Sequence, residues 1–342
     1  MTRTPYISGD TATFVWHGPA APLLLGDFNR WDDSRPVILE KDGTGTWSAE
    51  LHLPEDAYIE YAFRLDGDHL VDPGNPRKVF NGINKHNNYF YMPAAVPTSL
   101  ARRQGGVPRG TVTEHSLPAF PWPGQSGMAA SLQRRRLTLY QPAGEGPFPL
   151  LLVYDGRDYL RQGRLLTILD NLIHQGRIRP LAVALLANGG PLRYIEYNCS
   201  DATLDLVYNR LLPFARQHLD LHDINANPGA FGVMGASLGG LMAMYTALRM
   251  PQIFGNVLSQ SGAFYPRSVL LDLVKMQERL PLDIWMDVGR LEWLLGMNES
   301  FRELLDSHGY PVTCRVYSGG HNYTAWRDDL WRGLEHLFGP RL

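Results

Sequence analysis

Hydrophobic and polar residues follow two different patterns along this chain. In residues 1–95, short segments alternate between apolar and polar positions or are apolar throughout, and turn signals such as GDFN, KDGTG and DPGNP separate them. Alternation with a period of two is typical of strands, and this part of the chain lacks helical spacing of any length. We therefore expect a small all-β, immunoglobulin-like sandwich. Its strands are expected at residues 11–16, 22–25, 46–53 and 58–65.

The pattern changes after a segment that is rich in glycine and proline. Residues 96–128 include RRQGGVPRG and PAFPWPGQSG, a composition typical of a linker, with one strand expected near residues 110–117. From there on, uniformly apolar segments alternate with segments of helical spacing. Strands that are apolar on both faces belong to parallel sheets covered by helices on both sides, so we predict an α/β domain over residues 129–342. Its helices are expected at residues 163–175, 204–219, 238–250, 268–280, 298–309 and 324–338.

One stretch of the second domain, GVMGASLGGLMA, combines four glycines with a serine. A strand is expected to end at Gly235 and a helix to begin at Leu238, so Ser237 lies on the turn between them. G-x-S-x-G at such a turn is the nucleophile elbow of the α/β-hydrolase fold, which has a mostly parallel central sheet. The sharp turn presents the serine hydroxyl, and side chains at Gly235 and Gly239 would collide with the neighbouring strand and helix. The alternative is a glycine-rich turn whose serine only caps the helix.

An activated serine needs a base and a group that orients the base. In α/β-hydrolases the chain order is serine, acid, histidine. His321 is the expected base, because it follows the strand TCRVYS and two glycines, where a loop can present its ring. Two carboxylates compete for the third role, Asp287 near the end of a strand and Glu292 in the loop after it. We favour Glu292, since a loop residue reaches the imidazole more readily, and Asp287 stays the alternative.

Backbone N–H groups are expected to stabilise the oxyanion of the reaction. One is that of Leu238, the residue after the serine, at the start of a helix whose dipole favours negative charge. The other is expected from Gly156 or Arg157, in the loop after the strand LLLVYDG. This chemistry implies no metal and no organic cofactor.

Several segments of the second domain together resemble a known family. LLVYDGRDYL, RYIEYN, GASLGGLMAMYTALRMPQIFGNVLSQSGAF, GRLEWLL and GGHNYTAWRDDL follow one another across residues 131–340. They resemble the enterochelin esterase-like branch of the esterase D group of α/β-hydrolases, to which feruloyl esterases are related. The resemblance implies that Ser237 and His321 are catalytic, and it supports Glu292 as the acid.

The same resemblance suggests a substrate. The first enzymes named in the family hydrolyse the ester bonds of catecholate siderophores, and relatives release ferulate or acetate from plant cell-wall polysaccharide. Arg193 of RYIEYN would suit an anionic or catecholate group; the alternative is an arginine paired with Glu196. Trp326 is a second residue expected to contact the substrate. We predict a serine carboxylic-ester hydrolase of the siderophore esterase type that acts through an acyl-enzyme, with a polysaccharide-directed feruloyl or acetyl esterase as the alternative.

The first domain resembles the carbohydrate-binding module at the N-terminus of glycogen-branching enzymes and isoamylases. GDFNRWD, YAFRLDG and DPGNP carry the resemblance. Two sugar-contacting positions depart from the pattern: Ala62 stands where a lysine is usual, and His69 where a second aromatic ring is usual. Trp31 remains, and a lone tryptophan stacks weakly on sugar. We therefore expect a structural role, with glycan binding doubtful and a non-catalytic glycan-binding protein as a further alternative.

Charge and cysteine content limit which partners, disulfides and metal sites are expected. The formal net charge is −2, which argues against partners held by bulk electrostatics, such as nucleic acid or a membrane surface. The only cysteines, Cys199 and Cys314, are far apart, so neither a disulfide framework nor a zinc site is expected. We expect a cytoplasmic enzyme acting on a small-molecule ester, with a homodimer as an open alternative.

Overall fold

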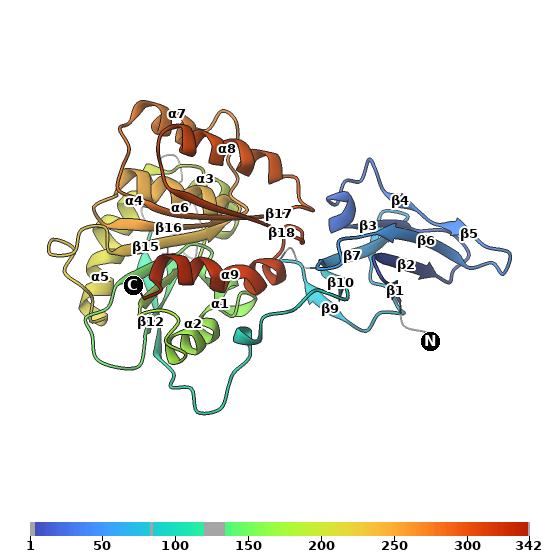
Figure 1. The fold of residues 1–342 in the computed structure, drawn as a ribbon, viewed down its shortest axis with the longest axis horizontal. Coiled ribbons are helices and arrows are strands. Elements are labelled where there is room, and N and C mark those ends of the chain that lie inside the picture. The colour runs from blue at the N-terminus through green and yellow to red at the C-terminus, as the bar shows by residue number, and fades with distance from the viewer. Residues whose placement is uncertain (1–3, 83–84, 120–133, 341–342) are drawn as a thin grey trace. The chain divides into compact units, whose positions relative to one another are not determined.

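The computed structural model describes residues 4–82, 85–119 and 134–340, and the chain divides into two compact units (Figure 1). The first unit contains residues 1–97 together with two segments from late in the chain. These segments are Gly289–Leu295 and Val316–Ala325. The second unit consists of Thr98–Val288, Gly296–Arg315 and Trp326–Leu342. No helix among the described residues combines the length and the apolar character that crossing a membrane requires.

The first unit is a β-sandwich of two antiparallel sheets. One sheet has the strand order β1-β2-β6-β5, and the other has the order β4-β3-β7-β10-β9, with β8 paired to β7. The strands are β1 (Tyr6–Ser8), β2 (Thr11–Trp16), β3 (Leu23–Gly26), β4 (Val37–Ile38), β5 (Glu40–Lys41), β6 (Trp47–His52), β7 (Tyr58–Leu65), β8 (Asp68–Leu70), β9 (Lys78–Phe80) and β10 (His86–Tyr91). The predicted all-β sandwich is thereby confirmed, because alternating side chains of both sheets face one shared core.

Aromatic rings fill that shared core. Phe14 of β2 meets Tyr61 of β7 edge to face, with ring centroids 4.9 Å apart, and Phe90 of β10 lies against both. Such pairs add about 0.5–1.5 kcal/mol each beyond the burial of their area. Leu291, from the segment Gly289–Leu295, packs against the same core. The late segment therefore belongs to this unit through hydrophobic contact.

The second unit is built on one sheet of eight strands in the order β11-β12-β14-β13-β15-β16-β17-β18. The pairs from β14 through β17 are parallel, whereas β12 pairs antiparallel with both β11 and β14. The strands are β11 (Thr111–Pro118), β12 (Arg134–Gln141), β13 (Leu150–Val153), β14 (Ala182–Leu186), β15 (Phe231–Ala236), β16 (Phe254–Gln260), β17 (Asp283–Gly289) and β18 (Val312–Tyr317). The α/β-hydrolase-like fold with a mostly parallel sheet is confirmed.

Helices cover both faces of this sheet, since its central strands are apolar on both sides. In Figure 1, α1, α2 and α9 lie on one side of the strands, and α6 and α7 lie on the other. The α-helices are α1 (Gly156–Arg161), α2 (Leu165–His174), α3 (Arg193–Tyr197), α4 (Asp201–Leu206), α5 (Leu212–His218), α6 (Leu238–Arg249), α7 (Val269–Met276), α8 (Leu295–Ser307) and α9 (Tyr323–Phe338). A π-helical segment, Val207–Leu211, joins α4 to α5, so the helix predicted at residues 204–219 is interrupted.

The segment predicted to be a linker contains ordered structure. Thr98 already belongs to the second unit, and β11 is the edge strand of its sheet. The eight residues of β11 pair antiparallel with β12, from Thr111 opposite Gln141 to Pro118 opposite Arg134. An edge strand tolerates proline because only one of its sides takes part in the ladder. Residues 120–128 of the predicted linker lie outside the described residues.

Candidate active site

Ser237 occupies the turn between β15 and α6 in a conformation that is strained for a residue with a side chain. Its φ is 58° and its ψ is −124°, and strain of this kind costs about 1–3 kcal/mol. The turn is held on both sides of the residue. The Ser237 N–H donates to the Gln260 carbonyl at 2.9 Å, and the Ala263 N–H donates to the Ser237 carbonyl at 3.0 Å. Backbone bonds to the last residue of β16 and to the segment after it therefore keep the serine at this turn.

The two glycines of the elbow are required by close approach, as the sequence predicts. A Cβ added at Gly235 would lie 2.4 Å from the carbonyl carbon and oxygen of Gly239. A Cβ at Gly239 would lie 3.0 Å from Oδ2 of Asp155 and 3.5 Å from Cβ of Tyr154. The start of α6 thus packs directly on the end of β13, the strand next to β15.

Three backbone N–H groups are free to act as donors at this end of the sheet. Leu238 is the first residue of α6, and Gly156 and Arg157 are the first two of α1. Within the described ranges, no hydrogen-bond acceptor faces the backbone N–H of these three residues. The two helices follow the parallel neighbours β13 and β15, which pair Val153 with Met234. First-turn amides without partners are the groups that stabilise an oxyanion.

Sequence reasoning missed Asp155, which organises the same end of the sheet. The residue is buried, with φ of 52°, and its carboxylate accepts from Arg193 Nε at 2.8 Å and Nη2 at 2.6 Å. Asn188 donates to it at 2.5 Å. The Asp-Gly pair at the end of the strand LLLVYDG is the signal that could have found it.

Arg193 therefore has a different partner from the one that sequence reasoning offered. Its guanidinium makes a bidentate ion pair with Asp155, and Nη2 lies 3.4 Å from the Ala236 carbonyl beside the serine. Glu196 instead forms a buried ion pair with Arg135 and accepts from the Gly189 N–H at 2.7 Å. The alternative predicted from the sequence named the wrong carboxylate: Arg193 does form an ion pair within the protein, but with Asp155, while Glu196 neutralises Arg135.

Asp287 is buried inside the second unit and accepts hydrogen bonds from two neighbouring side chains. Its carboxylate accepts from Nε2 of Gln260 at 3.3 and 3.2 Å and from Nε1 of Trp285 at 3.0 Å. Gln260 in turn accepts from the Tyr159 hydroxyl at 2.9 Å. Because the carbonyl of Gln260 also holds the Ser237 N–H, this network supports the nucleophile turn.

Glu292 and His321, the predicted acid and base, both lie in the first unit. Nδ1 of His321 is 2.5 Å from Oε2 of Glu292, and the second carboxylate oxygen accepts from the Gly289 N–H at 2.7 Å. Glu292 is fully buried, whereas His321 keeps 13% of its side chain exposed. A carboxylate fixed in this way orients an imidazole and stabilises its protonated form.

Two tryptophans, Trp326 of the second unit and Trp293 of the first, have opposite environments. Trp326, expected to contact substrate, is buried, and its indole N–H donates to the Ser261 hydroxyl at 2.8 Å. Its burial favours a packing role over the predicted contact. Trp293, which sequence reasoning missed, is 49% exposed, and its ring centroid is 4.7 Å from that of His321. The tryptophan directly after Glu292 in GRLEWLL was the available signal.

Trp31 also has a defined structural partner. Its indole N–H donates to Oδ1 of Asp27 at 2.9 Å. Ala62 is buried, and Nε2 of His69 is 2.9 Å from the His86 carbonyl. These contacts supply a structural reason for each of the three residues considered for sugar binding.

The family of the chain follows from its similarity to known proteins. Residues 129–337 match the Esterase family, described as “Putative esterase”, and this range is more than half of the chain. The chain belongs to this esterase family. It is accordingly a carboxylic ester hydrolase, and this part of the prediction is confirmed.

Two relatives of this chain are named iron(III) enterobactin esterases. The chain is 32% identical to the iron(III) enterobactin esterase of Dickeya dadantii, in an alignment covering 95% of this chain and 87% of that protein. It is 29% identical to the iron(III) enterobactin esterase of Escherichia coli K12, over 56% of this chain and 50% of that one. The predicted resemblance to enterochelin esterases is confirmed.

Solved structures share the fold. The enterobactin esterase from Shigella flexneri, crystallised in the presence of enterobactin, has a TM-score of 0.76 at 22% identity and covers 96% of this chain and 92% of its own. A ferulic acid esterase has a TM-score of 0.55 at 18% identity and covers 68% of this chain and 98% of its own. The first likeness extends over nearly all of this chain, and the second over about two thirds of it.

Proposed function

We propose that this esterase hydrolyses the ester bonds of a catecholate siderophore, with Ser237 as nucleophile, His321 as general base and Glu292 as the acid that orients the base. Support for these roles comes from each half of the site. Ser237 lies on a strained elbow beside free backbone donors, and the imidazole of His321 is bonded to a buried carboxylate. The three residues follow β15, β17 and β18 of one sheet, in the chain order of α/β-hydrolases.

The proposed reaction follows from these groups. His321 takes the proton of the Ser237 hydroxyl as its oxygen attacks the ester carbonyl, and Glu292 stabilises the resulting imidazolium. The N–H groups of Leu238 and of Gly156 or Arg157 donate to the oxyanion. The imidazolium then protonates the leaving alcohol, which leaves an acyl-enzyme on Ser237. Water, deprotonated by His321, attacks this acyl group and releases the acid by the same steps in reverse.

The extent of similarity is the observation that carries the substrate class. The Dickeya dadantii relative, named for iron(III) enterobactin, aligns with 95% of this chain, including the β-sandwich. The ferulic acid esterase structure covers 68%. A bifunctional endo-1,4-beta-xylanase/feruloyl esterase from Xylanibacter ruminicola aligns with 88% of the chain, but at 24% identity and over 41% of its own length. The siderophore esterase is therefore the better supported function, and the feruloyl esterase is the second candidate.

Two residues bear on how an aromatic acyl group would be held. The exposed ring of Trp293 beside His321 offers a surface for stacking a catechol ring. The charge of Arg193 is already balanced by Asp155, so its predicted role in binding an anionic group is weakened. We expect the main role of Arg193 to be structural, namely to fix the loop that contains Asp155 through this ion pair.

A panel of three esters tests the substrate class. We expect kcat/KM for a catecholate trilactone to exceed that for methyl ferulate by at least about 100-fold, because remote contacts with the correct substrate lower the barrier at the reacting carbonyl. p-Nitrophenyl acetate serves as the reference for intrinsic esterase activity. A preference for methyl ferulate over the trilactone would instead favour the feruloyl esterase, and would leave the nucleophile assignment in place.

A further inference from the structure

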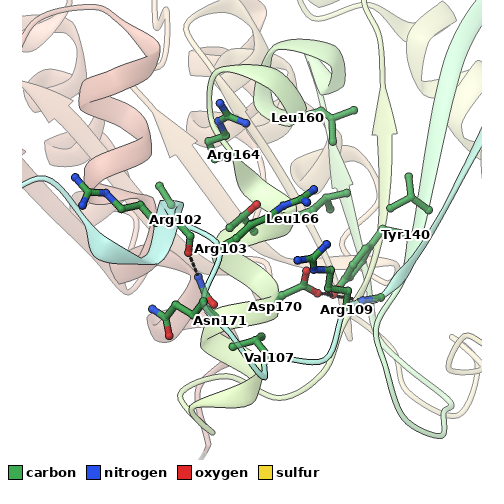
Figure 2. A pocket seen from close by; sticks show the side chains of 15 residues that line it. Arg102, Arg103, Val107, Arg109, Tyr140, Leu160, Arg164, Leu166, Asp170 and Asn171 are labelled. Carbon is green, nitrogen blue, oxygen red and sulfur yellow. Dashed lines mark hydrogen bonds between the residues drawn. The ribbon is translucent and has the colours of Figure 1, made fainter.

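A hollow lined by arginines lies within the second unit, and none of the residues proposed to react or to stabilise the oxyanion lines it. Its volume is about 540 Å³. Arg102, Arg103 and Arg109 come from the segment before β11, and Arg164 is the residue that precedes α2. Figure 2 shows Arg103, Arg109 and Arg164 around the hollow, with the guanidinium group of Arg102 turned away from them. We call these four residues and the hollow the arginine pocket.

Buried hydrogen bonds hold the wall of the arginine pocket in place. The side chain of Asn171 on α2 is buried, and its Nδ2 donates to the carbonyls of Leu100 at 2.7 Å and Arg102 at 2.9 Å. Asp170, also on α2, accepts from the Tyr140 hydroxyl at 2.7 Å and from the Gly110 N–H at 3.2 Å. The arginine-bearing segment is therefore fastened to α2 at both of its ends.

Positive charge in this pocket is balanced only in part by the protein. Within the described ranges no carboxylate pairs with the four guanidinium groups, and the undescribed residues include neither aspartate nor glutamate. The only acid in the lining, Asp170, is bonded to Tyr140 and Gly110. Four arginines and one aspartate give the lining a formal charge of +3, in a chain whose net charge is −2. All four arginines are exposed, so solvent screens part of the repulsion among them, and a bound anion removes the remainder.

We propose that the arginine pocket binds a small organic molecule carrying a diphosphate group. Guanidinium forks match phosphate oxygens in pairs, and two linked phosphates carry roughly three negative charges near neutral pH, enough to balance the lining. The volume lies within the range of roughly 300–1,000 Å³ that is usual for ligand pockets, and it exceeds what a diphosphate alone would fill. Val107, Leu160 and Leu166 provide apolar surface for the organic part.

The strand register places this pocket apart from the nucleophile. Tyr140 pairs with Val183, which pairs with Leu151, so Tyr140 is level with the beginning of β13. The free N–H groups of Gly156 and Arg157 follow the end of β13. Leu160 of α1 lines the arginine pocket, but Gly156 and Arg157 do not, and the inference does not depend on the proposed substrate.

Calorimetric titration of the full chain tests the proposal, with inorganic pyrophosphate and ADP as probes at constant ionic strength. We expect both to bind with one site per chain, ADP more tightly, and both more tightly than inorganic sulfate. The double variant Arg103→Ala/Arg109→Ala should bind pyrophosphate at least about tenfold more weakly, since two charge-assisted contacts are lost. Hydrolysis of p-nitrophenyl acetate by this variant should equal that of the wild type.

A matched variant separates this site from general electrostatics. Arg216→Ala/Arg267→Ala removes the same charge from exposed positions outside the pocket and should bind pyrophosphate as the wild type does. Binding to the wild type no tighter than that of sulfate would overturn the proposal, as would equal weakening in the two double variants. Pyrophosphate binding as tightly as ADP would overturn the organic part of it.

A different observation concerns Asp27, a buried carboxyl of the motif GDFNRWD in the first unit. Its Oδ2 accepts from the Glu60 N–H at 2.8 Å and from Nδ2 of Asn322 at 3.3 Å, and Oδ1 accepts from Trp31. A Cβ added at Gly320 would lie 2.1 Å from Oδ1 of Asp27. The loop that carries His321 is therefore in direct contact with Asp27, on both sides of the histidine.

The charge of Asp27 also interacts with the loop that contains Glu292. Burial raises the pKa of its carboxyl to about 7, the hydrogen bonds from Glu60 and Trp31 oppose this, and the charge of Glu292 adds to the rise. Leu291 next to Glu292 donates its N–H to the Gly319 carbonyl at 3.1 Å. The carboxyl of Asp27 thus lies close to the Glu292–His321 pair without bonding to the imidazole.

We infer that Asp27 is a positioning residue for His321, an inference that rests on the proposed function. Hydrogen bonding to Asn322 and contact with Gly320 hold the backbone of the loop, so the imidazole keeps its direction while its outer nitrogen takes the proton of Ser237. The motif that resembles a sugar-binding module would then serve catalysis, through the loop that it supports. This role also gives a reason for glycine at Gly320, where any side chain would displace the carboxyl.

A double-mutant cycle on Gly320→Ala and Asp27→Ala tests the inference. Each single change should lower kcat for p-nitrophenyl acetate by about 100-fold with KM within about twofold, because a displacement near 1 Å suffices for such a loss. The double variant should be no slower than the slower single one, since both remove the same contact. Gly43→Ala, whose added Cβ meets nothing within 4 Å, is the control and should keep the wild-type rate.

Two outcomes would overturn the role of Asp27. A wild-type kcat in Gly320→Ala would do so even if Asp27→Ala fails to fold, and so would losses that multiply in the double variant. Parallel assay of Ser237→Ala keeps the two proposals apart. If that variant loses activity while the cycle is additive, the catalytic assignment stands and only the positioning role fails.

Discussion

Replacing Ser237 with alanine should lower kcat for p-nitrophenyl acetate by about 10⁶-fold, the scale of serine knockouts in catalytic triads. The substitution removes one oxygen from an elbow that is already held by backbone bonds to Gln260 and Ala263, so the fold should stay intact. The measurements are steady-state hydrolysis and covalent labelling with a fluorophosphonate, which reacts only with an activated serine. The wild type should be labelled and the variant should not.

A control is available on α8. Ser307 is exposed, and its hydroxyl donates to the Leu304 carbonyl, so Ser307→Ala should keep both the rate and the labelling of the wild type. Turnover by Ser237→Ala within tenfold of the wild type would remove Ser237 from the mechanism and, with it, the proposed function.

Replacing Glu292 with glutamine should lower kcat by about 10⁴-fold, the loss seen when the acid of a triad becomes an amide. The amide has nearly the size of the carboxylate, but it lacks the charge that stabilises the imidazolium. It also favours the wrong ring nitrogen for the proton. Fluorophosphonate labelling of Ser237 should persist at a reduced rate, because the serine itself is unchanged.

Asp287→Asn is the matched comparison for this second prediction. It makes the same chemical change in the carboxylate that accepts from Gln260 and Trp285. An amide nitrogen there faces one of these donors, so we expect a lower melting temperature and a kcat reduced by less than about 100-fold. The reverse ranking of the two variants in kcat would transfer the acid role to Asp287.

The sequence signals of the candidate site are mostly local, which is why they could be recognised without a structure. The elbow needs small residues at Gly235 and Gly239, and the G-x-S-x-G pattern that shows this spans only five consecutive residues. His321 follows two glycines after a strand, which leaves a loop free to present its ring. These patterns depend on neighbours in the chain, so reading them required no tertiary contact.

Other members of the site depend on contacts distant in sequence. Asp155 and Arg193 are 38 residues apart, and no spacing rule links a strand-end aspartate to that arginine rather than to another. Arg135 and Glu196 are 61 residues apart, and because they pair with each other, Glu196 is not the ion-pair partner of Arg193. Asp27 and Asn322 are 295 residues apart. A charged residue that becomes buried needs a partner of opposite charge, but only the fold determines which residue that partner is.

By itself the sequence determined that this protein has a β-sandwich followed by a parallel α/β sheet, and that Ser237 lies on a strand-to-helix turn. Periodic burial and the steric requirements of a tight turn depend on a few neighbouring residues, so the local order of residues in the sequence shows them directly. Only the tertiary structure showed that Nδ1 of His321 bonds to Glu292, and that two late loops belong to the first unit. The physical reason is that hydrogen-bond partners are chosen by distance in space, which the order of residues along the chain does not specify.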